Sequence, residues 1–132
     1  MKNRNRNKDE GWTEYLRENP QLAEDLILEA EQRTIAEIEA KYGKAIVAYN
    51  RTKFKLHGLV AELIKLDEGQ EEAGKPGVWS EEMHRVNDRN EKEWDRLTRE
   101  FYVKHGRRYE AYEREIADCK ARYKELKALL LP

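Results

Sequence analysis

The chain has 132 residues, of which 40% are charged, and its 26 Lys and Arg against 27 Asp and Glu give a net charge of −1. This charged share is well above the roughly 25% of an average domain, and no segment approaches the ~18 apolar residues that a membrane span requires. One cysteine excludes an internal disulfide framework, and the polar start Met1–Lys8 is unlike a secretory signal peptide, so we expect a cytoplasmic helical protein.

The N-terminal segment divides into two short pieces. Residues 1–9 are basic, rich in asparagine and without large apolar side chains, so we expect a disordered basic arm. Residues 10–19 carry apolar side chains at helical spacing and predict a short N-terminal helical turn. Asn19 followed by Pro20 is typical of a helix start, because Asn is a good N-cap and Pro is favoured at the first helical position.

Two long helices are predicted after Pro20. The first covers residues 20–66, where no further proline occurs and apolar residues recur at helical spacing. Residues 67–80 contain three glycines and one proline, which predicts a loop. Ser80 is a suitable N-cap for a second helix over residues 81–130. The sequence therefore predicts an all-α fold.

The apolar positions of both predicted helices repeat every eleven residues. In the second helix two such series run in parallel: Val86, Leu97, Arg108, Cys119 and Leu130, and beside them Asn90, Phe101, Tyr112 and Tyr123. An eleven-residue repeat corresponds to about 3.67 residues per turn, which predicts nearly straight helices rather than a leucine-zipper supercoil.

A weak internal repeat relates the two helices at an offset of 63 residues, with ten identities in 34 positions. If the loop folds the chain back on itself, Gly43 and Gly106 face each other, and we expect the helix backbones to cross closely there. The alternative is that both glycines are C-caps, which would divide the chain into four shorter helices. Because the eleven-residue phase continues across both glycines, we favour continuous helices.

Charge and aromatic content complete the predicted fold. Asp9–Ala40 is strongly acidic and Lys41–Leu66 is basic, which favours an antiparallel arrangement that sets segments of opposite charge side by side. The chain also carries more aromatic area than the contact between two helices can bury. We therefore predict a long antiparallel two-helix hairpin, coiled-coil-like, that dimerises into a four-helix assembly.

No motif predicts an enzyme, a cofactor or a metal site. Glu81-x-x-His84 has the spacing of half a di-iron ligand set, and no second copy of it is present. Glu115-x-x-Asp118 resembles half of the magnesium site of all-α nucleotide pyrophosphohydrolases, and the other half is missing. Cys119 lies at an apolar repeat position, so we expect a small core residue rather than a nucleophile.

The sequence favours a non-enzymatic interaction protein that dimerises and binds or occludes a protein partner. Aromatic side chains dominate the energetics of protein interfaces. The residues expected to form the interface are therefore the aromatic ones of the second helix: Trp94, Phe101, Tyr102, Tyr109 and Tyr112. Small helical proteins of neutral charge and without a catalytic motif are typical of phage and mobile-element accessory factors, such as scaffolds and inhibitors of host machinery.

The alternative is a nucleic-acid-associated factor. Basic arms can fold on RNA or enter a DNA minor groove, and a nearby aromatic ring can stack on a base. The residues that would contact nucleic acid are Lys2, Arg4, Arg6, Lys8 and Trp12, with a further basic patch at the end of the second helix. The neutral net charge argues against this alternative, because backbone binders gain from excess cations. The outer helix faces mix both signs of charge, so we expect no membrane binding.

Overall fold

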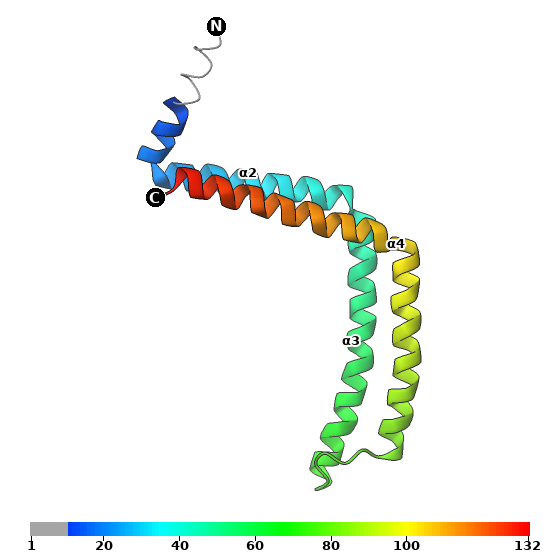
Figure 1. Ribbon diagram of the computed structural model, residues 1–132. Helices are drawn as coiled ribbons and strands as arrows, with labels where there is room; N and C mark the ends of the chain where they lie inside the picture. The colour runs from blue at the N-terminus through cyan, green and yellow to red at the C-terminus, as the bar shows by residue number, and fades with distance from the viewer. Residues whose placement is uncertain (1–10) are drawn as a thin grey trace. The chain divides into compact units, whose positions relative to one another are not determined.

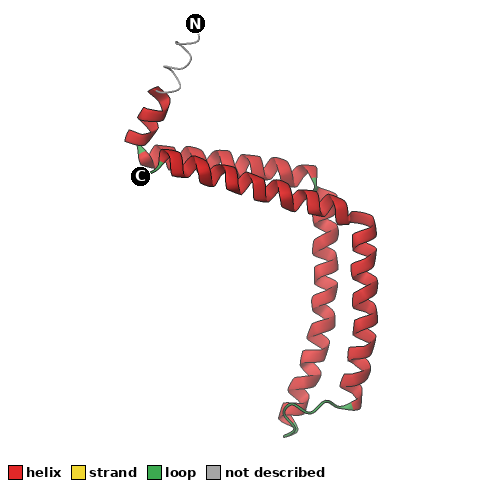
Figure 2. Cartoon of the chain, viewed as in Figure 1, coloured by secondary structure: helices red, strands yellow, loops and turns green. Residues whose placement is uncertain are grey.

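The structure is a computed structural model that describes residues 11–132, and within this range it is about 90% helical without strands. A short helix over residues 11–18 precedes α2 (Pro20–Lys41), α3 (Gly43–Glu72) and α4 (Glu81–Leu130) (Figures 1 and 2). The predicted all-α class is confirmed. Among the described residues, no helix combines the length and apolarity needed to cross a membrane.

The start of α2 uses Pro20 as expected, but Asn19 acts differently from the predicted cap. Pro20 occupies the first helical turn, where its missing N–H leaves no donor unpaired. The Asn19 side chain makes no capping hydrogen bond to α2; its amide instead donates to the Tyr15 carbonyl at 2.8 Å. The Asn19 side chain therefore satisfies a carbonyl at the end of the preceding helix. Its backbone carbonyl accepts a hydrogen bond from Ala23 N at 3.0 Å, which is the first hydrogen bond of α2.

The expected continuous helix over residues 20–66 is interrupted at Tyr42. This residue has φ −110° and ψ 21°, and its N–H still donates to the Ile38 carbonyl at 3.2 Å. The Tyr42 side chain is buried, with its ring centroid 6.2 Å from that of Tyr112. Gly43 follows with an ordinary negative φ, so the interruption is not a glycine C-cap either. A buried ring, which the local sequence does not encode, accompanies the break.

The predicted loop over residues 67–80 is shorter in the structure, because α3 continues to Glu72. Gly74 has φ 76° and ends the helix, since this left-handed conformation costs glycine nothing. Gly74 N donates to the Glu71 carbonyl at 3.0 Å, and Lys75 N donates to the Gln70 carbonyl at 2.8 Å. These two bonds form a Schellman cap, which satisfies the last carbonyls of α3.

Helix α4 has the same bounds as the helix expected there, and it passes through Gly106 without interruption. The Ser80 hydroxyl accepts a hydrogen bond from Met83 N at 3.2 Å, as expected of an N-cap. At the other end, the Arg17 guanidinium donates to the Leu129 carbonyl at 3.2 Å. A cation at this position also interacts favourably with the negative end of the helix dipole.

Burial along α4 follows the eleven-residue series. The buried members are Val86, Asn90, Leu97, Phe101, Cys119 and Leu130. Arg108 is the exposed member of its series, and Tyr112 and Tyr123 are partly buried. The repeat therefore marks the side of α4 that packs against the rest of the chain.

The described chain divides into two compact units. The first combines residues 11–42 with residues 111–132, so that α2 packs against the second part of α4. Ala23, Ile27 and Cys119 belong to its core. The second unit comprises residues 43–110.

In the second unit, α3 and the first part of α4 lie side by side and are joined by the loop (Figure 1). The Asn90 amide on α4 donates to the Leu59 carbonyl on α3 at 2.8 Å. This pairing fits the register in which Gly43 would lie opposite Gly106. In the first unit the partners lie further along α4 than that register predicts, because Lys41 pairs with Glu115 at 3.0 Å.

Candidate protein-interaction surface

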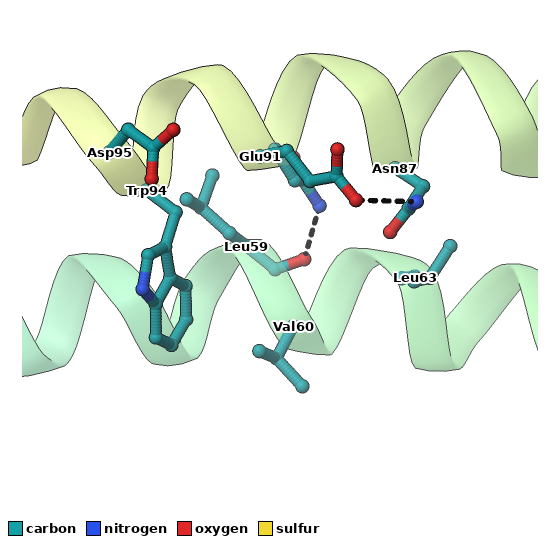
Figure 3. A pocket seen from close by; sticks show the side chains of 8 residues that line it. Leu59, Val60, Leu63, Asn87, Glu91, Trp94 and Asp95 are labelled. Carbon is teal, nitrogen blue, oxygen red and sulfur yellow. Dashed lines mark hydrogen bonds between the residues drawn. The ribbon is translucent and has the colours of Figure 1, made fainter.

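A groove of about 330 Å³ runs between α3 and α4 in the second unit. Figure 3 shows that its side chains come from both helices, with Trp94 reaching from α4 toward α3. The lining residues are Leu59, Val60, Leu63, Asn87, Asn90, Glu91, Trp94 and Asp95. We call this feature the Trp94 groove.

The floor of the Trp94 groove is held by Asn90. This side chain is 8% exposed, and its amide nitrogen makes the 2.8 Å bond to the Leu59 carbonyl. Its Oδ1 atom is buried and has no hydrogen-bond partner within the described part of the chain. A buried polar side chain in an otherwise apolar seam fixes the register of two helices at a cost in stability.

The walls of the groove are apolar and partly open to solvent. Trp94 is 41% exposed and Val60 is 45% exposed, and Ile64, one turn beyond Val60, is 52% exposed. The rim on α4 is acidic, with Asp95 and with Glu91, whose carboxylate accepts a hydrogen bond from Asn87 at 3.4 Å. Apolar side chains at the centre with a polar rim are the usual anatomy of a protein interface.

The opposite side of the same helix pair is closed by charged side chains. Arg89 on α4 pairs with Glu62 on α3, and Arg96 pairs with both Glu93 and Glu100 along α4. The hydrogen bond from Arg96 holds the pKa of Glu93 below its ordinary value. The two long faces of the second unit therefore differ: one presents apolar side chains, and the other presents ion pairs.

A second and smaller groove, of about 180 Å³, lies on the charged side. We call it the cationic groove, because Arg51, Lys55 and Lys104 line it. Its one acidic lining residue is Glu100, which pairs with Lys104 at 3.0 Å. The hydrogen bond from Lys104 lowers the pKa of Glu100, so that this carboxylate offsets part of the positive charge.

The structure does not bring the five predicted interface residues together on one open surface. Phe101 is 8% exposed, and its ring lies 5.8 Å from both Tyr49 and Tyr109. Tyr109 in turn stacks on Tyr49 at 4.1 Å and 10°. These rings hold α3 against α4, so the chain buries much of the aromatic area that we assigned to a partner.

The other three predicted interface residues are distributed between the two units. Tyr112 belongs to the first unit, where it packs on Tyr42. Tyr102 and Trp94 belong to the second unit and are both exposed. Of the five, Trp94 is the one that lines the apolar groove.

The surroundings of the two predicted crossing glycines are open to the facing helix. A Cβ atom added to Gly43 would meet nothing within 4 Å. A Cβ atom added to Gly106 would lie 2.9 Å from Cδ1 of Tyr102, which is on the same helix. The nearest atoms therefore do not come from the facing helix, and the close crossing stays a prediction.

The residues of the alternative nucleic-acid reading are only partly described. Lys2, Arg4, Arg6 and Lys8 lie outside the described residues. Trp12 is exposed, and its ring meets that of Tyr15 edge to face, with centroids 6.0 Å apart.

Val60 and Ile64 are exposed apolar residues of α3 that were not among the residues predicted to form the interface. The sequence does hold a signal for this exposure, which is the width of the apolar side of α3. Leu59 and Leu63 form one row along the helix, and Val60 and Ile64 form a second row beside it. One partner helix covers a narrower stripe than this, so the second row is left exposed.

Among residues 11–132, no group of three or more His, Cys, Asp or Glu side chains is arranged to hold a metal ion. Cys119 is buried and not in a disulfide. Comparisons with known protein families, with curated proteins and with solved structures find no match for this chain.

Proposed function

We propose that the chain is a non-enzymatic helical interaction protein that binds or occludes a protein partner through the Trp94 groove. One observation carries the proposal: Trp94 and Val60, large apolar side chains that are 41% and 45% exposed, line the same groove, and Ile64 follows Val60 one turn along α3 at 52% exposed. Apolar side chains that gather in this way around a groove are typical of interaction sites. A partner helix that lays its apolar face there removes them from water.

The proposal also covers the pairing of α3 with α4 and the association of two chains. We infer that the second unit is an antiparallel, coiled-coil-like hairpin and that the chain self-associates into a four-helix assembly. The buried eleven-residue series on α4 and the Asn90 bond to Leu59 support the hairpin. The open apolar row on α3 supports the assembly, because a second pair of helices would cover it.

A photo-crosslinking experiment tests the proposal. A photoreactive amino acid replaces Trp94 in one variant and Val103 in the other, and both are irradiated in cells. Val103 is a matched control, because it is 80% exposed but lies outside the Trp94 groove. We expect a discrete protein adduct from position 94 alone. Equal adducts from both positions, or none from position 94, would contradict the proposal.

The cationic groove favours a second candidate function, which is binding to nucleic acid. Three cations from α3 and α4 could contact successive phosphates, and the basic N-terminal arm would add others. The test is oligonucleotide binding at several salt concentrations by the full chain, by a chain lacking residues 1–8 and by Arg51→Glu. Binding that weakens steeply with salt and is reduced in either variant supports this function. No binding at low salt would exclude it.

A further inference from the structure

We propose that the occupant of the Trp94 groove is a second copy of this chain, with α3 of each protomer lying over α4 of the other. The inference rests on the proposed function of the groove as a surface that binds helices. It goes further, because it names the partner, the orientation and the charges that set the orientation.

The first support is the placement of the cation Lys53 on the α3 side of the groove. Lys53, His57, Val60 and Ile64 follow one another at helical spacing, so they share one side of α3. Both Lys53 and His57 are exposed. The α3 side of the groove therefore continues from an apolar row into a polar one that ends at Lys53.

The second support is the placement of acids on the α4 side at the same height. Asp95 and Glu91 line the groove on α4. The Asn90 bond to Leu59 fixes the register of the two helices, and this register sets Lys53 near the level of Asp95 and His57 near the level of Glu91. Beside the groove, α3 thus carries the cation Lys53 at the height where α4 carries Asp95.

A twofold axis parallel to the helices makes these rims complementary. Rotation about such an axis keeps every residue at its height and exchanges the two rims, so that α3 of one copy lies over α4 of the other. Lys53 then faces the partner's Asp95, and His57 lies at the height of the partner's Glu91. The same contacts occur twice, as a closed twofold interface requires. The charges select this orientation, and the apolar side chains supply most of the free energy.

The available area is sufficient for a stable dimer. Helix α3 has 30 residues, which gives a length of about 45 Å at 1.5 Å per residue. Two adjacent helices of about 10 Å diameter present a face of about 900 Å². A stable interface buries about 800 Å² on each partner.

Size-exclusion chromatography with light scattering gives the first test. We expect the wild-type chain to have twice its 15.8 kDa mass. Val60→Lys should shift the mass to that of one chain with unchanged helicity, while Val103→Lys should remain dimeric. A monomeric wild type at high concentration, or a dimeric Val60→Lys, would overturn the inference.

Charge reversal tests the orientation. Lys53→Glu and Asp95→Lys each place like charges opposite one another, and each should raise the dissociation constant about tenfold, which is about 1.4 kcal/mol. An equimolar mixture of the two variants should recover wild-type affinity, because the mixed dimer restores an opposite-charge pair on both sides. A mixture as weak as either variant alone would overturn the proposed orientation.

Failure of this inference, and of the self-association proposed above, is separable from failure of the groove as a surface that binds another protein. A monomeric wild type that still gives a discrete adduct with another protein from position 94 removes the second copy and retains the interaction surface. A monomer that gives no adduct contradicts both.

Discussion

The two units hold their helices together by different means. In the first unit the Tyr123 hydroxyl lies 3.0 Å from that of Thr34 and 3.3 Å from the Ala30 carbonyl oxygen, and Lys41 pairs with Glu115. In the second unit aromatic rings join the helices, with Tyr49 stacked on Tyr109. The first pair combines these polar bridges with one ring contact, between Tyr42 and Tyr112, whereas the second pair adds a cluster of rings to the Asn90 bond and to the ion pair of Arg89 with Glu62.

This difference separates the aromatic residues that stabilise the chain from those available for binding. The rings of Phe101, Tyr49 and Tyr109 pack on one another within the second unit, so they are not available to a partner. Trp94 precedes this cluster along α4, and its apolar neighbours in the groove, Leu59, Val60 and Leu63, are aliphatic. The partner surface therefore depends on one aromatic side chain and on the second apolar row of α3.

The largest expected effect comes from removing the ring at the centre of the second unit. Phe101→Ala should lower the free energy of unfolding by about 3 kcal/mol, because truncation of a buried Phe loses its transfer free energy and leaves a cavity. Urea unfolding followed by circular dichroism measures this change. The control is Val103→Ala, which alters an exposed side chain of the same helix. A loss below about 1 kcal/mol for Phe101→Ala would mean that the ring cluster does not join the helices.

A smaller effect of opposite sign is expected at Asn90. Asn90→Leu should raise the free energy of unfolding by about 1 kcal/mol, because it removes a buried oxygen that has no partner and adds apolar contact. The gain should come with a loosened register, which faster amide hydrogen exchange near Leu59 would reveal. Asn50→Leu, at an exposed site on α3, is the control. A destabilised Asn90→Leu would show instead that the bond to Leu59 outweighs the unpaired oxygen.

These contrasts explain how far the sequence predicts the fold. Ser80 and the eleven-residue series are local signals, and α4 begins and packs as they indicate. The interruption at Tyr42 lies directly before Gly43, where a break was the alternative prediction, but Gly43 does not adopt the positive φ of a glycine cap. The interruption accompanies a ring contact with Tyr112, which is distant in the sequence. Contacts of this kind depend on tertiary packing and cannot be read from a helical pattern.

The candidate site was predictable only in part. Trp94 is recognisable as an aromatic residue on the packed side of α4. Phe101 carries the same signal, and only the structure shows that Tyr49 and Tyr109 surround it. Val60 looks like a core residue in sequence, because an apolar pattern does not state how many helices will cover it.

Two glycines test how the local backbone conformation contributes to stability. Gly74→Ala should lower the free energy of unfolding by about 1 kcal/mol, because alanine is strained at φ 76°. Gly43→Ala should raise it by up to about 1 kcal/mol, because the site is helical, open and free of positive φ. Thermal unfolding of the two variants measures both shifts. Equal shifts of the same sign would show that the backbone at one site differs from that described.

The smallest expected effect is the pH dependence of the polar bridges in the first unit. Hydrogen bonds from Tyr42 and Lys41 hold the pKa of Glu115 below its ordinary value of 4.5. A carboxyl group whose pKa is lower in the folded state stabilises the fold above its unfolded pKa, and this contribution is lost as the pH falls through the folded value. The hydrogen bond from Lys41 to Glu115 also raises the pKa of Lys41, so a second loss is expected above pH 10.5. We therefore expect Glu115→Gln to have a lower free energy of unfolding than wild type at pH 7, and we expect this difference to shrink below pH 4.5. Urea unfolding at several pH values measures the difference. Glu113→Gln, on the exposed side of the same helix, controls for net charge, and an identical pH dependence in both variants would contradict a specific role for Glu115.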